Sequence, residues 1–167
     1  MPEFIDHVTW DDLVLRSRPK SDLKEGQFPH RGAVVLPRTP NGKFILAKRA
    51  KDKHPFPDIW CCGIGGHVAS GETYEEAALR EMQEEAGISS SLEFLAVSQY
   101  DSPEEQILFH VFASQDHFSV EDFSPDPREI QYFKAFHLEE IEAMIAQDAS
   151  LFSPTFVKII EAVRKSL

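Results

Sequence analysis

The sequence predicts an α/β chain in which short strands are interleaved with helices. Two observations lead to this fold class. Short apolar runs are separated by turn residues, as in residues 33–36 and 43–48 on either side of Asn41-Gly42. Apolar residues at helical spacing follow a helix-start signal at Thr73 and recur near the C-terminus. With 167 residues, 42% of them hydrophobic, and no linker, we expect a single domain over residues 1–167.

The first part of the chain is predicted to be mostly extended. Residues 1–18 fit a strand pair or a strand and a turn, and residues 19–31 are loop-like, so residues 1–30 form an N-terminal extension. Residues 33–36 and 43–48 form a hairpin, because Asn41-Gly42 is a strong turn signal. A basic cluster follows at the end of this hairpin and comprises Lys48, Arg49 and Lys51. These side chains are either solvated charges at the end of a strand or contacts for substrate phosphates.

A glycine-rich segment leads into the best-defined helix of the sequence. Gly65 and its neighbours would let a phosphate or a metal ion approach the backbone closely. Thr73 and Glu76 form a capping box, so the helix begins at Thr73, and Gly87 ends it near residue 86. Its apolar arc, expected to pack on a sheet, comprises Ala78, Leu79, Met82 and Ala86.

The C-terminal half is predicted to hold two antiparallel strands, a further strand and two helices. The strand pair covers residues 92–100 and 106–113, and a polar loop covers residues 118–128. A strand over residues 129–137 and a helix over residues 138–146 follow. The last helix, over residues 154–167, has an apolar side formed by Phe156, Ile159, Ile160 and Val163.

Composition narrows the classes of function. A net charge of −11 and a sequence pI near 5.0 argue against binding nucleic acid or anionic membranes by general electrostatics. No leader-like or membrane-length apolar stretch is present, so we expect a cytoplasmic protein. Cys61 and Cys62 are adjacent and cannot form a normal bridge with each other, which excludes a disulfide framework.

Three carboxylates on nearly the opposite side of the predicted helix are the strongest functional signal. Glu81, Glu84 and Glu85 are either a solvated acidic face or a site for a hard divalent cation. The spacing favours the cation site, because every fixed position of the Nudix box pattern is present in residues 66–88. These positions are Gly66, Glu72, Arg80, Glu81, Met82, Glu84, Glu85, Gly87 and Ile88. The sequence therefore resembles the Nudix (MutT-like) hydrolase family.

The resemblance implies an α/β/α sandwich with a mixed sheet between helices, and a core over residues 31–163. It also implies Mg²⁺ or Mn²⁺ held by Glu81, Glu84 and Glu85, with the Gly66 carbonyl completing the shell. Arg80 would orient the glutamates, and Glu72 would brace the turn before the helix or hold a metal through water. Substrate phosphates would contact Lys48, Arg49 and Gly65.

The same resemblance implies hydrolysis of a nucleoside diphosphate linked to another moiety, by attack of water at phosphorus. Glu129 is our candidate for the general base, with Glu104 and Glu105 as competitors. Pro103 matches a mark of ADP-ribose pyrophosphatases, although Ser102-Pro103 also reads as a plain turn. Because dimers are common in this family, a homodimer is a further expectation.

Two other functions stay open. His30 and His67 match positions that hold metal in the isopentenyl-diphosphate isomerase branch of the family. Gly65, however, stands where those isomerases have an active-site cysteine, which favours hydrolysis over isomerisation. A non-catalytic ligand-binding module is the third hypothesis, and the intact set of box glutamates argues against it.

Overall fold

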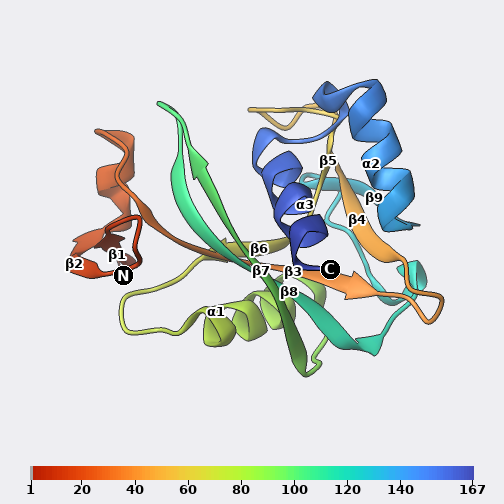
Figure 1. Ribbon diagram of the computed structural model, residues 1–167, viewed down its shortest axis with the longest axis horizontal. Coiled ribbons are helices and arrows are strands. Elements are labelled where there is room, and N and C mark those ends of the chain that lie inside the picture. Colours follow the sequence, from red (N-terminus) through yellow and green to blue (C-terminus); the bar gives the residue numbers. More distant parts are fainter. Residues whose placement is uncertain (1) are drawn as a thin grey trace.

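The computed structural model describes residues 2–167 and shows a mixed sheet between helices (Figure 1). The sheet has the strand order β5-β4-β3-β8-β7, with β6 paired to β3 and β9 paired to β4. Its strands are β3 (His30–Arg38), β4 (Phe44–Arg49), β5 (Trp60–Cys61), β6 (Ile64–His67), β7 (Leu92–Asp101), β8 (Gln106–His117) and β9 (Ile130–Phe136). The helices are α1 (Tyr74–Glu81), α2 (Leu138–Gln147) and α3 (Pro154–Ser166).

Strand β3 is the centre of this arrangement, and its two faces pack on different helices. Ala33 and Val35 belong to the apolar cluster that contains Met82 and the buried side of α1. Val34 and Leu36 belong to the cluster on the other face, which contains the buried residues of α2 and α3. In Figure 1, α1 accordingly lies below the sheet, and α2 and α3 lie above it. The predicted α/β/α sandwich is confirmed.

The two predicted antiparallel pairs are present. Gly42 has φ +80°, the left-handed conformation that this turn requires, and Arg38 pairs with Phe44 across the hairpin. Strands β7 and β8 pair from Leu92–Ser114 to Asp101–Gln106, so the turn between them covers residues 102–105. Strand β8 also runs parallel to β3, which the local sequence pattern did not reveal.

The N-terminal residues form a hairpin that is separate from the main sheet. Strands β1 (Phe4–Val8) and β2 (Val14–Pro19) pair antiparallel, so the strand-pair reading of residues 1–18 is correct for the described residues. The loop expected over residues 19–31 is partly wrong. It contains a short 3-10 helix, Lys20–Lys24, and β3 already begins at His30, because this residue and the next pair with β8.

Helix α1 begins where the sequence predicted and ends in a wider turn. Thr73 accepts a hydrogen bond from the Glu76 amide, and the Glu76 carboxylate accepts one from the Thr73 amide, which completes the capping box. After Glu81 the backbone continues as a π-helical turn, Met82–Ala86, and ends at Gly87 with φ +65°. The predicted apolar arc is wrong at Leu79, which is 40% exposed. The buried face instead centres on Ala78, and Leu79 lies about 100° further round the helix.

The remaining predicted elements are confirmed. Strand β9 follows the polar loop, and α2 and α3 follow it in that order. The predicted apolar side of α3 is buried in full: Phe156, Ile159, Ile160 and Val163. None of the helices between residues 2 and 167 has both the length and the apolar character that crossing a membrane requires.

Candidate active site

The site is built where strand β6 passes the C-terminal end of α1. Gly66 lies so close to the Glu81 carboxylate that a Cβ at this position would stand 2.3 Å from Glu81 Oε1. Gly65 is equally constrained, because a Cβ there would stand 2.9 Å from the Ala33 carbonyl oxygen. Only glycine lets a carboxylate from the helix and the backbone of β6 meet at this distance.

Arg80 holds the acidic residues of the box in place. Its Nε and Nη2 donate to the two carboxylate oxygens of Glu72 at 2.9 and 3.0 Å. Its Nη1 donates to Glu81 at 2.9 Å and to Glu84 at 3.4 Å, and its Nη2 also donates to the His67 carbonyl at 3.1 Å. A planar guanidinium suits this task because its donors are fixed relative to one another. Arg80 thus ties the loop, the strand and the helix together.

Glu85 lies on the other side of Glu81 and faces β6. The Gly65 amide donates to Glu85 Oε2 at 3.4 Å. Partial burial against β6 and the neighbouring Glu81 carboxylate raise the pKa of Glu85 above its usual range. Two carboxylates so close together repel unless a proton or a cation lies between them.

These donors fit a hard divalent cation. Carboxylate and carbonyl oxygens are the ligands that Mg²⁺ and Mn²⁺ prefer, and Glu81, Glu85 and the Gly66 carbonyl would supply them. Within residues 2–167, however, no three His, Cys, Asp or Glu side chains converge as a complete ligand set. Glu84 is turned toward Arg80, and its side chain is 58% exposed.

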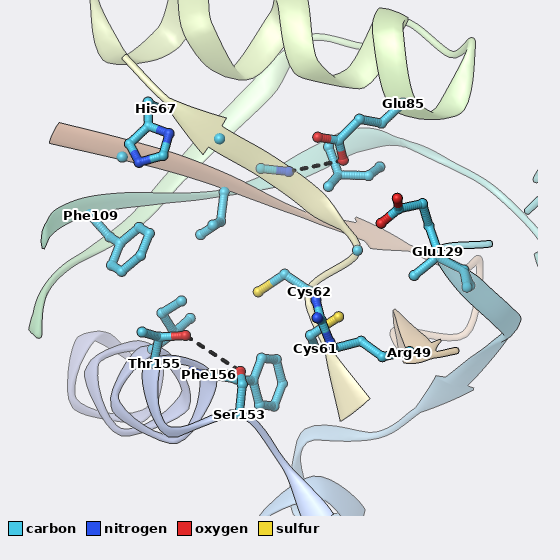
Figure 2. Close-up of a pocket in the computed structure, with 18 of the residues that line it drawn as sticks. Arg49, Cys61, Cys62, His67, Glu85, Phe109, Glu129, Ser153, Thr155 and Phe156 are labelled. Atoms are coloured by element: carbon cyan, nitrogen blue, oxygen red, sulfur yellow. Dashed lines mark hydrogen bonds between the residues drawn. The ribbon is translucent and has the colours of Figure 1, made fainter. Parts of the chain in front are cut away.

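A cavity of about 660 Å³ opens beside these glutamates. It lies between the sheet and α3, and Figure 2 shows Phe109 of β8 and Phe156 of α3 facing it from different sides. Much of its wall is apolar: Val34, Ile64, Ile107, Phe109, Phe133, Phe156 and Ile159. Its charged residues are Arg49, Glu84, Glu85, Glu105, Asp126 and Glu129. Among the described residues, the wall therefore combines hydrocarbon with an excess of carboxylate.

The two basic residues predicted to bind phosphate, Lys48 and Arg49, lie in different surroundings. Arg49 lines the cavity and donates to the carbonyl oxygens of Phe56 and Pro55 at 2.9 and 2.8 Å. Lys48 instead lies 3.8 Å from Asp58 Oδ1 and 5.1 Å from the Trp60 ring centroid. The pairing of β4 with β9 shifts register between Lys48 and Arg49, so the regular alternation of strand side chains is interrupted at this pair.

Of the candidate bases, Glu129 and Glu105 line the cavity. Glu129 is paired with Lys53. Burial raises the pKa of Glu105, which sits in the turn between β7 and β8. The Glu104 amide closes this turn by donating to Ser102 Oγ at 3.2 Å, which agrees with the plain-turn reading of Ser102-Pro103.

His67 lines the cavity, and its ring packs against that of the buried His30. Their rings stack with centroids 5.0 Å apart, and the His30 Nδ1 lies 2.8 Å from the Phe28 carbonyl oxygen. Burial and the neighbouring His30 lower the pKa of His67 to about 4, so both rings are neutral at physiological pH.

The apolar wall of the cavity is what sequence reasoning missed. Phe109 lies within the strand predicted over residues 106–113, and Phe156 lies on the apolar side of the last predicted helix, so the sequence indicates only that both are apolar. A core position and a cavity wall have the same sequence pattern, because both face inward from a strand or a helix. The parallel pairing of β8 with β3 would have been needed to distinguish a core position from a cavity wall.

Comparison with known proteins identifies the family. An uncharacterized Nudix hydrolase of Streptomyces coelicolor is 36% identical over 101 residues, which cover 59% of this chain and 56% of that protein. An isopentenyl-diphosphate Delta-isomerase of Nocardia farcinica is 28% identical over 136 residues, which cover 79% and 77%. The chain spans only slightly more than half the length of the first two curated relatives it matches.

A solved structure and a family model agree with this result. The crystal structure of a Deinococcus radiodurans protein superposes with a TM-score of 0.70 and 25% identity, covering 98% of this chain and 99% of that one. The model of the NUDIX domain matches residues 28–156, which include the glycine segment, the box and the cavity lining except Ile159. The chain belongs to the Nudix family of hydrolases.

Proposed function

We propose that this protein is a metal-dependent hydrolase that cleaves the diphosphate bond of a small organic diphosphate by attack of water at phosphorus. One observation carries the proposal. Among the described residues that line the cavity, Arg49 is the cationic side chain, and Glu84, Glu85, Glu105, Asp126 and Glu129 are acidic. A diphosphate would be repelled from such a site unless divalent cations entered with it.

The box residues have different proposed roles. Glu81, Glu85 and the Gly66 carbonyl would hold Mg²⁺ or Mn²⁺, and Glu84 would join them by turning from Arg80. Bound divalent cations neutralise phosphate oxygens and lower the pKa of water. Arg80 keeps Glu81 and Glu72 in register, and Arg49 is placed to contact the phosphates.

Glu129 is our proposed general base. Its carboxylate lines the cavity, and Figure 2 shows it and Glu85 at the same end of the view. Lys53 forms an ion pair with this carboxylate. A carboxylate held in the cavity is a suitable group to accept a proton from the attacking water. Glu105 lies in the β7–β8 turn and lines a different part of the wall, beside Ile107 and Phe109.

Two substrate classes follow from different observations. The box resemblance favours a nucleoside diphosphate linked to another moiety, and Phe109 offers a ring on which a base could stack. The extensive apolar wall favours a hydrocarbon group, and a relative named for isopentenyl diphosphate supports an isoprenoid diphosphate as the second candidate. We rank the nucleoside class first and let one panel decide between them.

The test follows hydrolysis by phosphorus NMR of the products, with Mg²⁺, with Mn²⁺ and with EDTA. ADP-ribose should give two phosphate monoesters, whereas nucleoside diphosphates and isopentenyl or dimethylallyl diphosphate should give a monophosphate and inorganic phosphate. We expect turnover only with metal. Glu85→Gln should lower kcat by about 10³-fold, because it removes a charged ligand of the ion that the reaction needs. Glu104→Gln is the matched control, because it changes an exposed glutamate outside the cavity. Unchanged turnover in Glu85→Gln would refute the assignment of the site.

The same panel separates the alternatives. Conversion of isopentenyl to dimethylallyl diphosphate without hydrolysis of either would favour the isomerase-like function. Binding of a diphosphate with no change in it would favour a ligand-binding module. Size-exclusion chromatography in the same buffers tests the proposed homodimer.

A further inference from the structure

We propose that the N-terminal hairpin β1–β2 is a positioning device for the Nudix box, with Asp12 as its main positioning residue. The hairpin lies outside residues 28–156, which the family model matches. It nevertheless contacts the loop that precedes α1 at both ends of that loop. The inference goes beyond the proposed reaction, but one arm of its test rests on that function.

The first attachment is at Ser70, near the start of the loop. The Ser70 amide donates to the Phe4 carbonyl at 2.9 Å, and Ile5 and Ala69 form an antiparallel bridge. The Ser70 hydroxyl donates to Asp6 Oδ1 at 2.8 Å and lies 2.7 Å from Ser17 Oγ. Both strands of the hairpin therefore hold this one residue of the loop.

The second attachment is at Tyr74, the first residue of α1. The Tyr74 hydroxyl donates to Asp12 Oδ1 at 3.0 Å. The same oxygen accepts from Arg31 Nε at 2.6 Å, and Arg31 Nη2 donates to the Asp12 carbonyl at 3.1 Å. Asp12 thus connects the hairpin, the central strand β3 and the start of the catalytic helix.

The backbone of Asp12 indicates that its side chain is needed there. Asp12 has φ +66°, a conformation that glycine adopts at lower cost than aspartate. Strained positions persist where the surrounding contacts over-determine them, and they cluster at functional sites. A glycine would relieve the strain but would leave Arg31 and Tyr74 without their shared acceptor.

The loop between the two attachments carries Glu72. Glu72 pairs with Arg80 through both carboxylate oxygens, and Arg80 in turn pairs with Glu81. A shift of the loop would therefore be passed through Arg80 to the carboxylate that lies against Gly66. Misplacing reacting groups by about 1 Å can lower a rate about 100-fold.

The test compares Asp12→Gly and Tyr74→Phe with Asp22→Asn in the full-length protein. Asp12→Gly keeps the turn conformation, and Tyr74→Phe keeps the ring that stacks on His110. Asp22→Asn is the control, since it removes an N-terminal ion pair with Arg18 that does not touch the loop. Asp12→Asn, which keeps an acceptor oxygen and tolerates positive φ, should restore part of any loss.

Three measurements are made on each variant. Hydrogen exchange of loop amides 68–74 should become at least about 10-fold faster in Asp12→Gly, to a smaller extent in Tyr74→Phe, and not in Asp22→Asn. The dissociation constant for Mn²⁺, followed by the EPR signal of the free ion, should rise about 10-fold in Asp12→Gly. With an identified substrate, kcat should fall about 10- to 100-fold while KM changes little.

Unchanged exchange in the loop would show that the hairpin does not hold it, and would overturn the inference. Faster exchange with wild-type Mn²⁺ affinity and wild-type kcat would also overturn it, because the hairpin would then be merely structural. A wild-type protein that hydrolyses no diphosphate of the panel would refute the proposed function instead. The exchange and Mn²⁺ measurements would still decide the role of Asp12.

Discussion

Replacing Gly66 with alanine is the sharpest test of how the site is built. The new Cβ would stand 2.3 Å from Glu81 Oε1 and 2.7 Å from its Cδ, whereas ordinary contacts begin near 3.4 Å. The carboxylate would have to retreat by about 1 Å, which is the difference between the first and the last of these distances. Arg80 holds the same oxygen at 2.9 Å, so the retreat also disturbs this ion pair.

The expected result is a large loss of activity with a small change in stability. A displacement of about 1 Å is expected to lower kcat about 100-fold, equivalent to about 2.7 kcal/mol in the barrier. The fold should persist, because the displaced atoms are the end of a side chain and alanine restricts the unfolded chain more than glycine does. We expect the Tm to stay within about 4 °C of the wild-type value.

The assay is diphosphate hydrolysis at saturating substrate, combined with Mn²⁺ binding and thermal unfolding. Gly26→Ala is the matched control, because nothing lies within 4 Å of the Cβ that would be added there. A Gly66→Ala protein with wild-type kcat and wild-type Mn²⁺ affinity would refute the reasoning. It would show that the close approach of Glu81 to β6 has no part in catalysis.

Two further predictions follow from the buried titratable groups. The pKa values of His7, His30, His67 and His110 are lowered, chiefly by burial, so the unfolded chain binds more protons than the folded one below about pH 6.5. Thermal melts should therefore show stability falling from pH 7 toward pH 4, by at most about 1.4 kcal/mol per pH unit for each histidine. The decline should be shallower in His30→Leu but not in a variant of the exposed His54, and equal slopes would contradict this account. Burial also raises the pKa values of the Cys61 and Cys62 thiols. Iodoacetamide at pH 7.5 should accordingly alkylate the folded protein more than about tenfold slower than the unfolded one, and equal rates would show that these thiols are accessible.

Local rules in the sequence were sufficient for much of the fold. The capping box at Thr73, the turn at Gly42 and the stop at Gly87 each depend on residues within a few positions, and each is present. The spacing of Arg80 and the box glutamates is local in the same sense. For this reason the sequence alone predicted that Arg80 lies beside the box glutamates. The structure shows its ion pairs with Glu81 and Glu84.

The sequence did not separate Lys48 from Arg49 or reveal the cavity. The register of β4 against β9 shifts between these two neighbours, so which of them borders the cavity depends on tertiary pairing and not on regular strand alternation. Phe156 and Phe109 likewise have the pattern of core residues, although they form a cavity wall. Short-range periodicity indicates that a side chain faces inward, but it does not indicate whether that side chain packs in the core or lines a cavity.

Taken by itself, the sequence determined the family, the acidic helix and the chemistry that oxygen ligands favour. The tertiary structure decided that Glu81 lies against Gly66 and that Glu84 pairs with Arg80. It also decided that the hairpin reaches the box through Asp12. The physical reason is the range of the interactions involved. Helix caps and turns are fixed by neighbouring residues, whereas cavities and long-range contacts depend on how separate elements pack, which no local pattern encodes.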